Sequence, residues 1–153
     1  MGRALIVAVV VVALGVPAFA VAAGPETAGV VRVSAGPATV TRDGRVFPAV
    51  VGTKVRAGDT LATGPGGSLG VILRDNSSLS LGPESRLVIR TFLFAPSEGK
   101  LGLLVRLSRG TLACISGLIA RLAPESVRFE TPSATIGIRG TRFALRAGEP
   151  ASR

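Results

Sequence analysis

Glycine and proline recur so often along this chain that long helices are excluded over most of its length. Of the 153 residues, 20 are Gly and 10 are Pro, and short apolar stretches lie between them. Gly-Pro, Gly-Gly and Asp-Gly pairs are typical of tight turns, so the spacing predicts short strands joined by turns. The clearest turn is Asp43-Gly44, where both residues tolerate a positive φ and a hairpin between residues 38–41 and 45–51 is expected.

Apolar residues that alternate with small or polar ones lead to the same fold class. The period-two positions are Leu101, Leu103, Val105, Leu107, Val127, Phe129, Phe143 and Leu145. Such alternation turns one face of a strand toward the core. A helix fits only residues 112–123, where Gly117 and Pro124 limit it to a turn or two. The sequence therefore predicts an all-β fold, a single-domain β-sandwich or flattened barrel of short antiparallel strands.

The N-terminus has the three parts of a secretory signal. Met1-Gly2-Arg3 is a short positive start, residues 4–15 are apolar, and Pro17 precedes a run of small residues. This pattern predicts a signal peptide over residues 1–23, cleaved after Ala20 or Ala23. The alternative is an uncleaved anchor, because residues 4–23 approach the ~20 apolar residues that a bilayer span requires. Both interpretations place the rest of the chain in the periplasm or outside the cell.

The composition argues against an enzyme. The chain contains no His and one Cys, which removes the commonest general base, the commonest metal ligand and every Ser-His or Cys-His pair. A Ser-x-x-Lys match at residues 97–100 is expected in a surface loop, because of Pro96 and Gly99, rather than on a helix. Cys114 lies in an apolar run and is expected to be buried and inert; an intermolecular disulfide or a redox role is the alternative. We expect no catalytic residue, no metal and no cofactor.

Arginine dominates the charge of the chain. The formal net charge is +9, and only Lys54 and Lys100 among the 18 basic residues are Lys. This excess is either an ordinary solvated surface or a means of attracting an anionic partner, such as an envelope polymer, lipid head groups or an acidic protein face. Nucleic acid is not expected, because the chain is predicted to be exported and has no Tyr or Trp on which bases could stack.

Several short phrases follow one another in a fixed order along the chain. They occupy residues 52–55, 58–64, 67–68, 75–77, 79–87, 107–112, 129–134 and 138–143. This ordered set resembles the FecR domain family. The resemblance covers residues 29–146, which we expect to form one domain between a flexible start at 24–28 and a tail at 147–153. The residues that carry the signature are Gly58, Asp59, Thr63, Asp75, Ser85, Gly110, Thr131, Pro132, Arg139, Gly140 and Thr141.

These signature residues are expected to be mainly structural. Gly58-Asp59 and Asp75-Asn76 suit turns in which the side-chain oxygen bonds to local backbone. Thr131-Pro132 suits an edge strand or a kink, and Gly140 suits a bulge. Arg139 is the candidate for partner contact: a semi-buried Arg there is expected to pair with Asp59 or Asp75, or to reach a carboxylate or phosphate from outside.

The resemblance also implies a place in signalling. The best-known relatives regulate iron-siderophore uptake, with a cytoplasmic segment that controls a sigma factor, one membrane span, and this domain in the periplasm against an outer-membrane transporter. Because only three residues precede residue 4, we expect no sigma-binding arm. The expected function is therefore an exported, non-catalytic binding or scaffold module. The alternatives are a sensor component of a cell-surface signalling or iron-uptake system and a basic binder of anionic envelope polymer.

The chain ends soon after the last signature phrase, so we expect either a fold that closes without further strands or an open sheet edge. Such an edge invites a partner to add a strand, or a second copy of the chain to form a homodimer.

Overall fold

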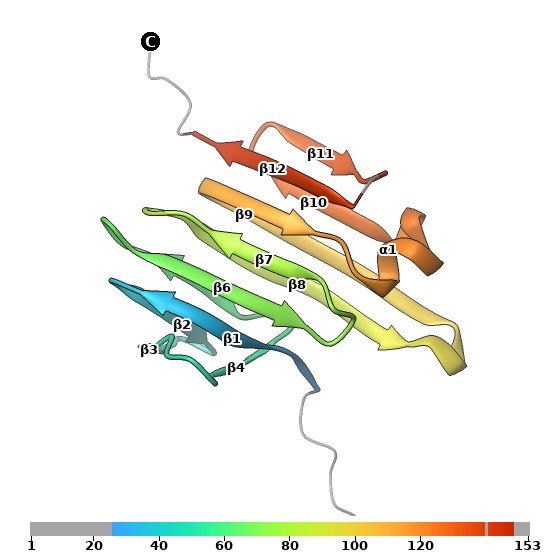
Figure 1. The fold of residues 1–153 in the computed structure, drawn as a ribbon, viewed down its shortest axis with the longest axis horizontal. Helices are drawn as coiled ribbons and strands as arrows, with labels where there is room; N and C mark the ends of the chain where they lie inside the picture. The colour runs from blue at the N-terminus through green and yellow to red at the C-terminus, as the bar shows by residue number, and fades with distance from the viewer. Residues whose placement is uncertain (1–25, 140, 149–153) are drawn as a thin grey trace, which may run out of the picture.

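A computed structural model of this protein describes residues 26–139 and 141–148, and these residues form an almost entirely β-stranded fold (Figure 1). The predicted signal peptide and Gly140 lie outside the described residues. The strands are β1 (Thr27–Ala35), β2 (Ala38–Arg42), β3 (Arg45–Pro48), β4 (Lys54–Arg56), β5 (Thr60–Thr63), β6 (Ser68–Leu73), β7 (Ser78–Leu81), β8 (Arg86–Ala95), β9 (Lys100–Ile115), β10 (Val127–Thr131), β11 (Ala134–Gly137) and β12 (Arg142–Ala147). The helical elements are α1 (Leu118–Leu122) and two 3₁₀ turns, η1 (Pro96–Glu98) and η2 (Pro124–Ser126).

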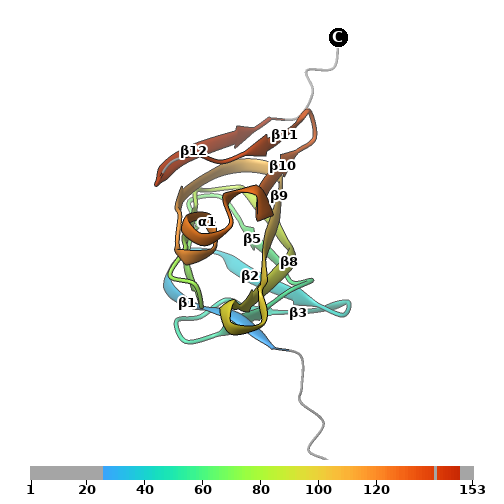
Figure 2. The ribbon, with the colours of Figure 1, turned by 90° about the vertical axis from the view of Figure 1, so that its right-hand side faces the viewer.

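The strands belong to one sheet that curls into two facing layers (Figure 2). Layer I has the order β4-β1-β6-β7-β9-β12, and layer II has the order β3-β2-β5-β8-β9-β10-β11. Neighbouring strands are antiparallel except β9 and β10, which run parallel. The predicted all-β fold is confirmed, in the form of a curled half-barrel.

Strand β9 joins the two layers because it belongs to both. Its first part pairs with β8 and β10 in layer II, and its last six residues pair with β7 and β12 in layer I. The change occurs at Gly110, whose φ of 89° lies in the left-handed region that glycine tolerates. A Cβ on Gly110 would collide with Ser85. Glycine is therefore needed here both for the backbone angle and for the close approach of β8.

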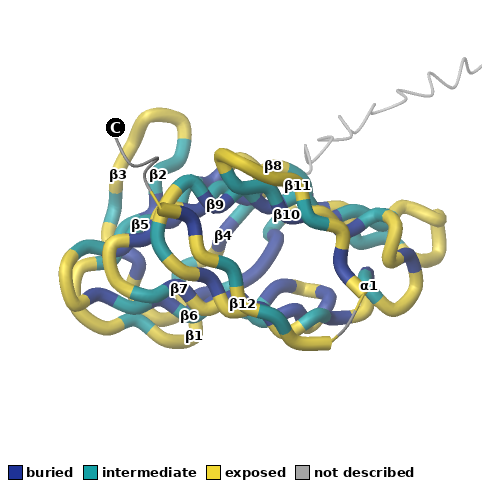
Figure 3. The backbone as a smooth tube through the Cα atoms, turned by 90° about the horizontal axis from the view of Figure 1, so that it is seen from above, coloured by how far each residue is buried: buried dark blue, intermediate teal, exposed yellow. Residues whose placement is uncertain are grey.

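The core lies between the two layers, on the faces that the alternating pattern turned inward (Figure 3). Leu103, Val105 and Leu107 are buried as predicted, whereas Leu101 at the start of β9 is half-buried. The largest fully buried side chains are Phe129, Leu61, Leu69, Leu73, Leu79, Leu87, Ile89, Leu107, Leu112 and Ile119. They come from both layers and from α1, so α1 closes the core at one end.

The predicted turns are present. Asp43 and Gly44 have φ angles of 49° and 76° and join β2 to β3 in a hairpin, as expected of an Asp-Gly pair. Asn76 has a φ of 66° in the turn between β6 and β7. The helical segment is limited to the five residues of α1, in agreement with the limit set by Gly117 and Pro124.

Five features differ from the sequence-based expectation. Strand β9 runs for 16 residues and takes in residues 112–115, which had been assigned to the only segment able to form a helix. Strand β10 returns beside β9 in parallel, and strands β4 and β11 had not been expected at all. Thr27 and Ala28 already pair or pack within β1, so the flexible start expected at 24–28 is wrong for these two residues. Ala147 ends β12 and is buried, so the tail expected at 147–153 begins too early.

Candidate functional site

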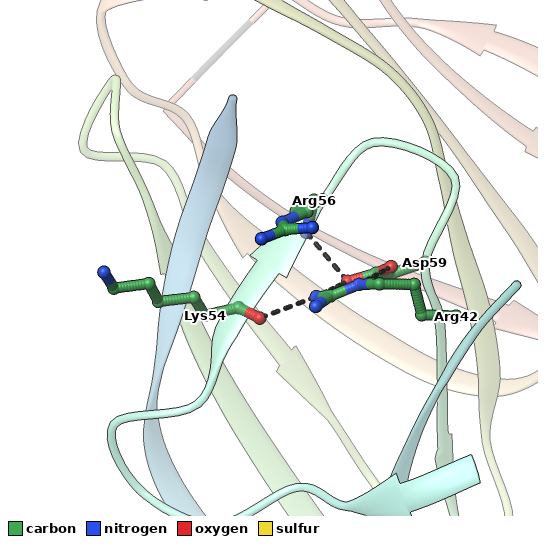
Figure 4. A network of polar contacts seen from close by, with 4 residues as sticks. All are labelled: Arg42, Lys54, Arg56 and Asp59. Atoms are coloured by element: carbon green, nitrogen blue, oxygen red, sulfur yellow. Dashed lines mark hydrogen bonds and ion pairs between the residues drawn. The ribbon is translucent and has the colours of Figure 1, made fainter. Parts of the chain in front are cut away.

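The first buried polar cluster is centred on Asp59 and ties the β4–β5 loop to β2 (Figure 4). Arg42 Nε donates to Asp59 Oδ1 at 2.9 Å, and Arg42 Nη2 donates to Oδ2 at 2.6 Å. The backbone N–H of Arg56 donates to the same Oδ2 at 2.8 Å, and Arg42 Nη2 also donates to the carbonyl of Lys54 at 2.9 Å. Asp59 is 1% exposed and Arg42 is 23% exposed, so the carboxylate end of this two-pronged ion pair is shielded from water and the guanidinium end only partly.

The surroundings of Arg42 stabilise its positive charge. The hydrogen bond to Asp59 raises the pKa of Arg42, although desolvation opposes the shift. The guanidinium also lies over the ring of Phe47, 5.3 Å from its centroid. Arg56 Nε is buried and has no hydrogen-bond partner among the described residues. Arg42 and the Arg56 backbone bind both Asp59 oxygens, so the cluster fixes the β4–β5 loop against β2.

The second cluster is centred on Asp75 in the turn between β6 and β7. Asp75 Oδ1 accepts from the Ser77 backbone N–H at 3.0 Å, and Oδ2 accepts from Ser77 Oγ at 2.7 Å. The segment that leads into α1 docks on the same pair: Gly117 N–H donates to Ser77 Oγ, and Ile119 N–H donates to Asp75 Oδ2. The predicted local backbone bond of Asp75 is confirmed. Asp75 therefore connects its own turn to α1, 44 residues further along the chain.

The third cluster joins β5, β8 and the bend of β9. Thr63 Oγ1 donates to the carbonyl of Gly82 at 2.6 Å and accepts from the Ser85 N–H at 3.0 Å. Ser85 Oγ accepts from the Thr111 N–H at 3.0 Å, next to the glycine at which β9 changes layer. Both Thr63 and Ser85 are buried. Their hydroxyl groups satisfy backbone groups that the crossing between layers leaves without a strand partner.

These clusters contain most of the signature residues named from the sequence. Gly58, Asp59, Thr63, Asp75, Ser85 and Gly110 lie in or beside them. Their burial and bonding support the predicted structural role. The clusters are spread over different turns, so they do not form one catalytic or ligand-binding site.

The remaining signature residues lie near the C-terminal hairpin. Thr131 ends β10, Thr131 Oγ1 accepts from the Ala134 N–H at 3.2 Å, and Pro132 is in the turn that leads to the edge strand β11. Thr141 precedes β12, and its carbonyl accepts from the Ser116 N–H at 2.8 Å. These positions agree with the edge or kink expected of Thr131-Pro132.

Arg139 does not pair with either predicted carboxylate. Asp59 is bound by Arg42, and Asp75 is bound by the Ser77 turn and by α1, so neither is available. Arg139 is also exposed rather than semi-buried, and it lines a hollow of about 580 Å³ together with Pro124 and Glu125. The predicted pairing is therefore wrong, while a contact between Arg139 and an outside partner stays a prediction.

β12 is the longest of the outer strands, those that pair with a described strand on one side alone. β12 pairs with β9 from Arg142 opposite Ile115 to Ala147 opposite Gly110, and no described strand pairs with its other side. The other outer strands, β3, β4 and β11, have four, three and four residues against the six of β12. An unpaired edge of this length is a template for another strand.

Two hydrogen bonds show which residues of β12 face the free side. Ser116 N–H donates to Thr141 O, and Gly82 N–H donates to Thr111 O from the opposite side of β9. Because antiparallel ladders alternate between bonded and non-bonded pairs, the backbone groups of Phe143 and Leu145 point toward β9. The N–H and C=O groups of residues 142, 144 and 146 therefore point away from β9, toward the free edge.

Most basic side chains in the described part of the chain have no acidic partner. Salt bridges there join Arg42 to Asp59, Arg74 to Glu26, and Lys100 to Glu98. Exposed arginines without an ion pair within the described ranges include Arg32, Arg86, Arg90, Arg109, Arg121, Arg128, Arg139, Arg142 and Arg146. The positive surface predicted from composition is therefore largely uncompensated.

Metal and thiol chemistry find little support in the described residues. No group of three or more His, Cys, Asp or Glu side chains among them is placed to hold a metal ion. Cys114 is 2% exposed, and burial, followed by the charge of Asp75, raises its pKa to about 12. The expected buried thiol is confirmed. A thiol with this pKa stays protonated at neutral pH and is a poor nucleophile.

Two contacts of these clusters were not predicted from the sequence. Arg42 is the partner of Asp59, but it lies 17 residues away on a different strand, and no local pattern distinguished it from the other arginines. Ser77 and Gly117 together dock α1, although their sequence separation is 40 residues. A Cβ on Gly117 would collide with the Asp75 carbonyl, so an unexplained glycine before a short helix was the available signal.

Comparison with known proteins identifies the family of this chain. A family model described as FecR protein matches residues 59–153, a range that contains the second and third clusters, Asp59 itself and β12. No curated protein and no solved structure matches the chain. No helix in residues 26–139 and 141–148 has the length and apolar character needed to cross a membrane. Members of the matched family are signalling regulators, generally associated with the cell envelope, rather than enzymes. Because this family model matches more than half of the sequence, the chain belongs to the FecR protein family.

Proposed function

We propose that this chain is an exported, non-catalytic binding or scaffold module, and that a protein partner adds a strand to the free edge of β12. The signal peptide predicted over residues 1–23 would direct it to the periplasm or out of the cell. One observation carries the proposal: residues 142, 144 and 146 direct backbone donors and acceptors away from β9, and no described strand uses them. Strand addition to such an edge supplies affinity through main-chain hydrogen bonds.

The three buried clusters favour a binding role over catalysis. Asp59 and Asp75, the buried carboxylates of the described residues, accept hydrogen bonds from turn and strand backbone, and Asp59 is also paired with Arg42. Groups used in this way hold loops in place and are not available to transfer protons. A frame held together by these bonds is well suited to present the free edge of β12 to a partner.

Two alternatives follow from other features. The family relation supports a sensor component of a cell-surface signalling or iron-uptake system, in which the partner would be a transporter or another regulator. The exposed arginines without acidic partners support a binder of anionic envelope polymer. The sheet-edge proposal is compatible with the first alternative, whereas the second needs only surface charge.

The test uses Ala144→Pro to alter the edge without breaking the internal ladder. The Ala144 N–H points to the free side, so proline removes one edge donor and adds a ring there while the bonds to β9 remain. Ala144→Ser is the matched control, because serine keeps the N–H. Each purified protein is incubated with an envelope extract, washed at low and high salt, and its partners are identified by mass spectrometry and then rebound in purified form.

We expect the unmodified protein and Ala144→Ser to retain the same purified protein partner at high salt, and Ala144→Pro to lose it. Retention of the partner by all three proteins, Ala144→Pro included, would refute binding at this edge. Recovery of anionic polymer alone, released at high salt, would replace the proposal with the polymer-binding alternative, because screened charge contacts are weakened by salt whereas strand addition is not.

A further inference from the structure

We infer that the strand which β12 accepts is acidic: two Asp or Glu residues four positions apart, separated by an apolar, a small and an apolar residue. The inference rests on the proposed function, since it assigns the chemistry of the partner at that edge. It follows from which face each β12 side chain occupies and from the charges that this edge leaves uncompensated.

The two faces of β12 differ in character. Phe143 and Leu145 are half-buried against the core, and the Phe143 ring meets Phe129 edge-on with centroids 4.8 Å apart. Arg142, Ala144 and Arg146 are exposed on the opposite face. Because directly opposed residues of neighbouring strands share a face, the partner residues beside Phe143 and Leu145 would cover the core side. Apolar side chains at these two positions would remove the remaining exposed apolar surface from water.

The outer face of β12 presents two positive charges. Arg142 lies opposite Ile115 and Arg146 lies opposite Thr111 on β9, so neither arginine has a carboxylate beside it on that strand. Neither makes a salt bridge within the described residues. Ala144 between them lies opposite Ala113, so the position between the two arginines carries a small uncharged side chain. Carboxylates facing Arg142 and Arg146, with a small residue facing Ala144, complement this face.

A second copy of the chain does not have this chemistry. Antiparallel pairing of two β12 strands about Ala144 would place Arg142 of one copy opposite Arg146 of the other, on both sides of the symmetry axis. Like charges directly opposite each other destabilise a strand pair. The charges at this edge therefore disfavour the homodimer that an open edge would otherwise allow, and favour an acidic partner.

The probe is a nine-residue peptide with Asp-Val-Ala-Val-Asp at its centre. The control peptide has the same composition in the order Val-Asp-Ala-Asp-Val, which would turn the carboxylates to the core side. Binding to the purified protein is followed by NMR titration and by amide hydrogen exchange. We expect exchange to slow at residues 142, 144 and 146, whose N–H groups face the free edge, and binding of the control peptide to be much weaker.

Charge variants of the protein give the second readout. The double substitution Arg142→Gln and Arg146→Gln is expected to lower the affinity of the protein for the acidic peptide by about 2- to 30-fold, the range for two exposed cross-strand ion pairs. Arg142→Glu with Arg146→Glu is expected to reject the acidic peptide and to bind one with Lys-Val-Ala-Val-Lys at its centre. Arg90→Gln, an exposed arginine on β8 in the other layer, is the control and should change nothing. Unchanged thermal unfolding shows that each variant folds.

These outcomes distinguish a failure of the proposed strand addition at β12 from a failure of the acidic assignment. If Ala144→Pro abolishes capture of the natural partner while the arginine variants bind it normally, the proposed edge function stands and the acidic assignment is wrong. If the peptide binds equally well in both orders, or binds Ala144→Pro as tightly as the unmodified protein, surface charge alone explains the binding and strand addition is refuted. A β12-dependent dimer in solution would also overturn the inference.

Discussion

Replacing Asp59 by Asn tests whether the ion pair with Arg42 holds the β4–β5 loop. Asn keeps the shape but exchanges one acceptor oxygen for a donor, which must then face a donor of Arg42 or the backbone N–H of Arg56. Breaking a buried ion pair costs about 3–5 kcal/mol. Arg42 is 23% exposed and can regain some hydration, so we expect the free energy of unfolding to fall by about 2–4 kcal/mol.

The assay is urea unfolding followed by far-UV circular dichroism, because the chain has no Trp or Tyr to report by fluorescence. Arg74→Ala is the matched control: it breaks the Arg74–Glu26 pair, whose side chains are 42% and 77% exposed, and should cost less than about 1 kcal/mol. The costs of Asp59→Asn and Arg42→Ala should not add, because each breaks the same pair. Additive costs, or a cost for Asp59→Asn no greater than the control, would refute the reasoning.

Two further predictions concern the bend of β9 and the buried thiol. Gly110→Ala should lower the free energy of unfolding by about 2–5 kcal/mol in the same assay, because the new side chain would sit at a positive φ and collide with Ser85. Gly102→Ala on the same strand is the control: its new Cβ would meet only the Leu93 side chain, at 3.6 Å, and the free energy of unfolding should change by less than about 1 kcal/mol. Equal effects of the two substitutions would contradict the role of the bend. Cys114, with its pKa raised to about 12, should resist a thiol reagent at pH 8 in the folded protein and react once urea unfolds it, and fast labelling of the folded state would contradict its burial.

The sequence identified turns and inward faces because both depend on neighbouring residues. Asp43-Gly44 requires positive φ angles that few other pairs tolerate, and the structure has them. The period-two run from Leu101 to Leu107 needs only the geometry of one strand. Features set within a few residues were therefore predictable, including the limit on helix length imposed by Gly117 and Pro124.

The features that the sequence did not identify depend on contacts between distant segments. Strand β10 lies parallel to β9, a pairing that needs the connection through α1 and η2 and has no local signature. Strand β4 has three residues, too few for a period to be recognised. Arg139 was considered a semi-buried partner for Asp59 or Asp75, but Arg42 and the Ser77 turn bind these carboxylates instead. The choice among many arginines is decided by the fold.

The membership of β9 in both layers has a consequence for how the chain folds. Until residues 100–115 are in place, β7 and β8 each end their layer at an unpaired flank. Strand β8 pairs with β9 as a local hairpin, in which Ala95 lies opposite Lys100, whereas the pairing of β7 with β9 joins residues as distant as Leu81 and Leu112. Non-local closure of this second kind slows folding to milliseconds or longer. Neither layer can separate from the other without losing its share of β9. We therefore expect folding to be slow and to occur in a single step, and the pairing of β9 with both layers to limit its rate.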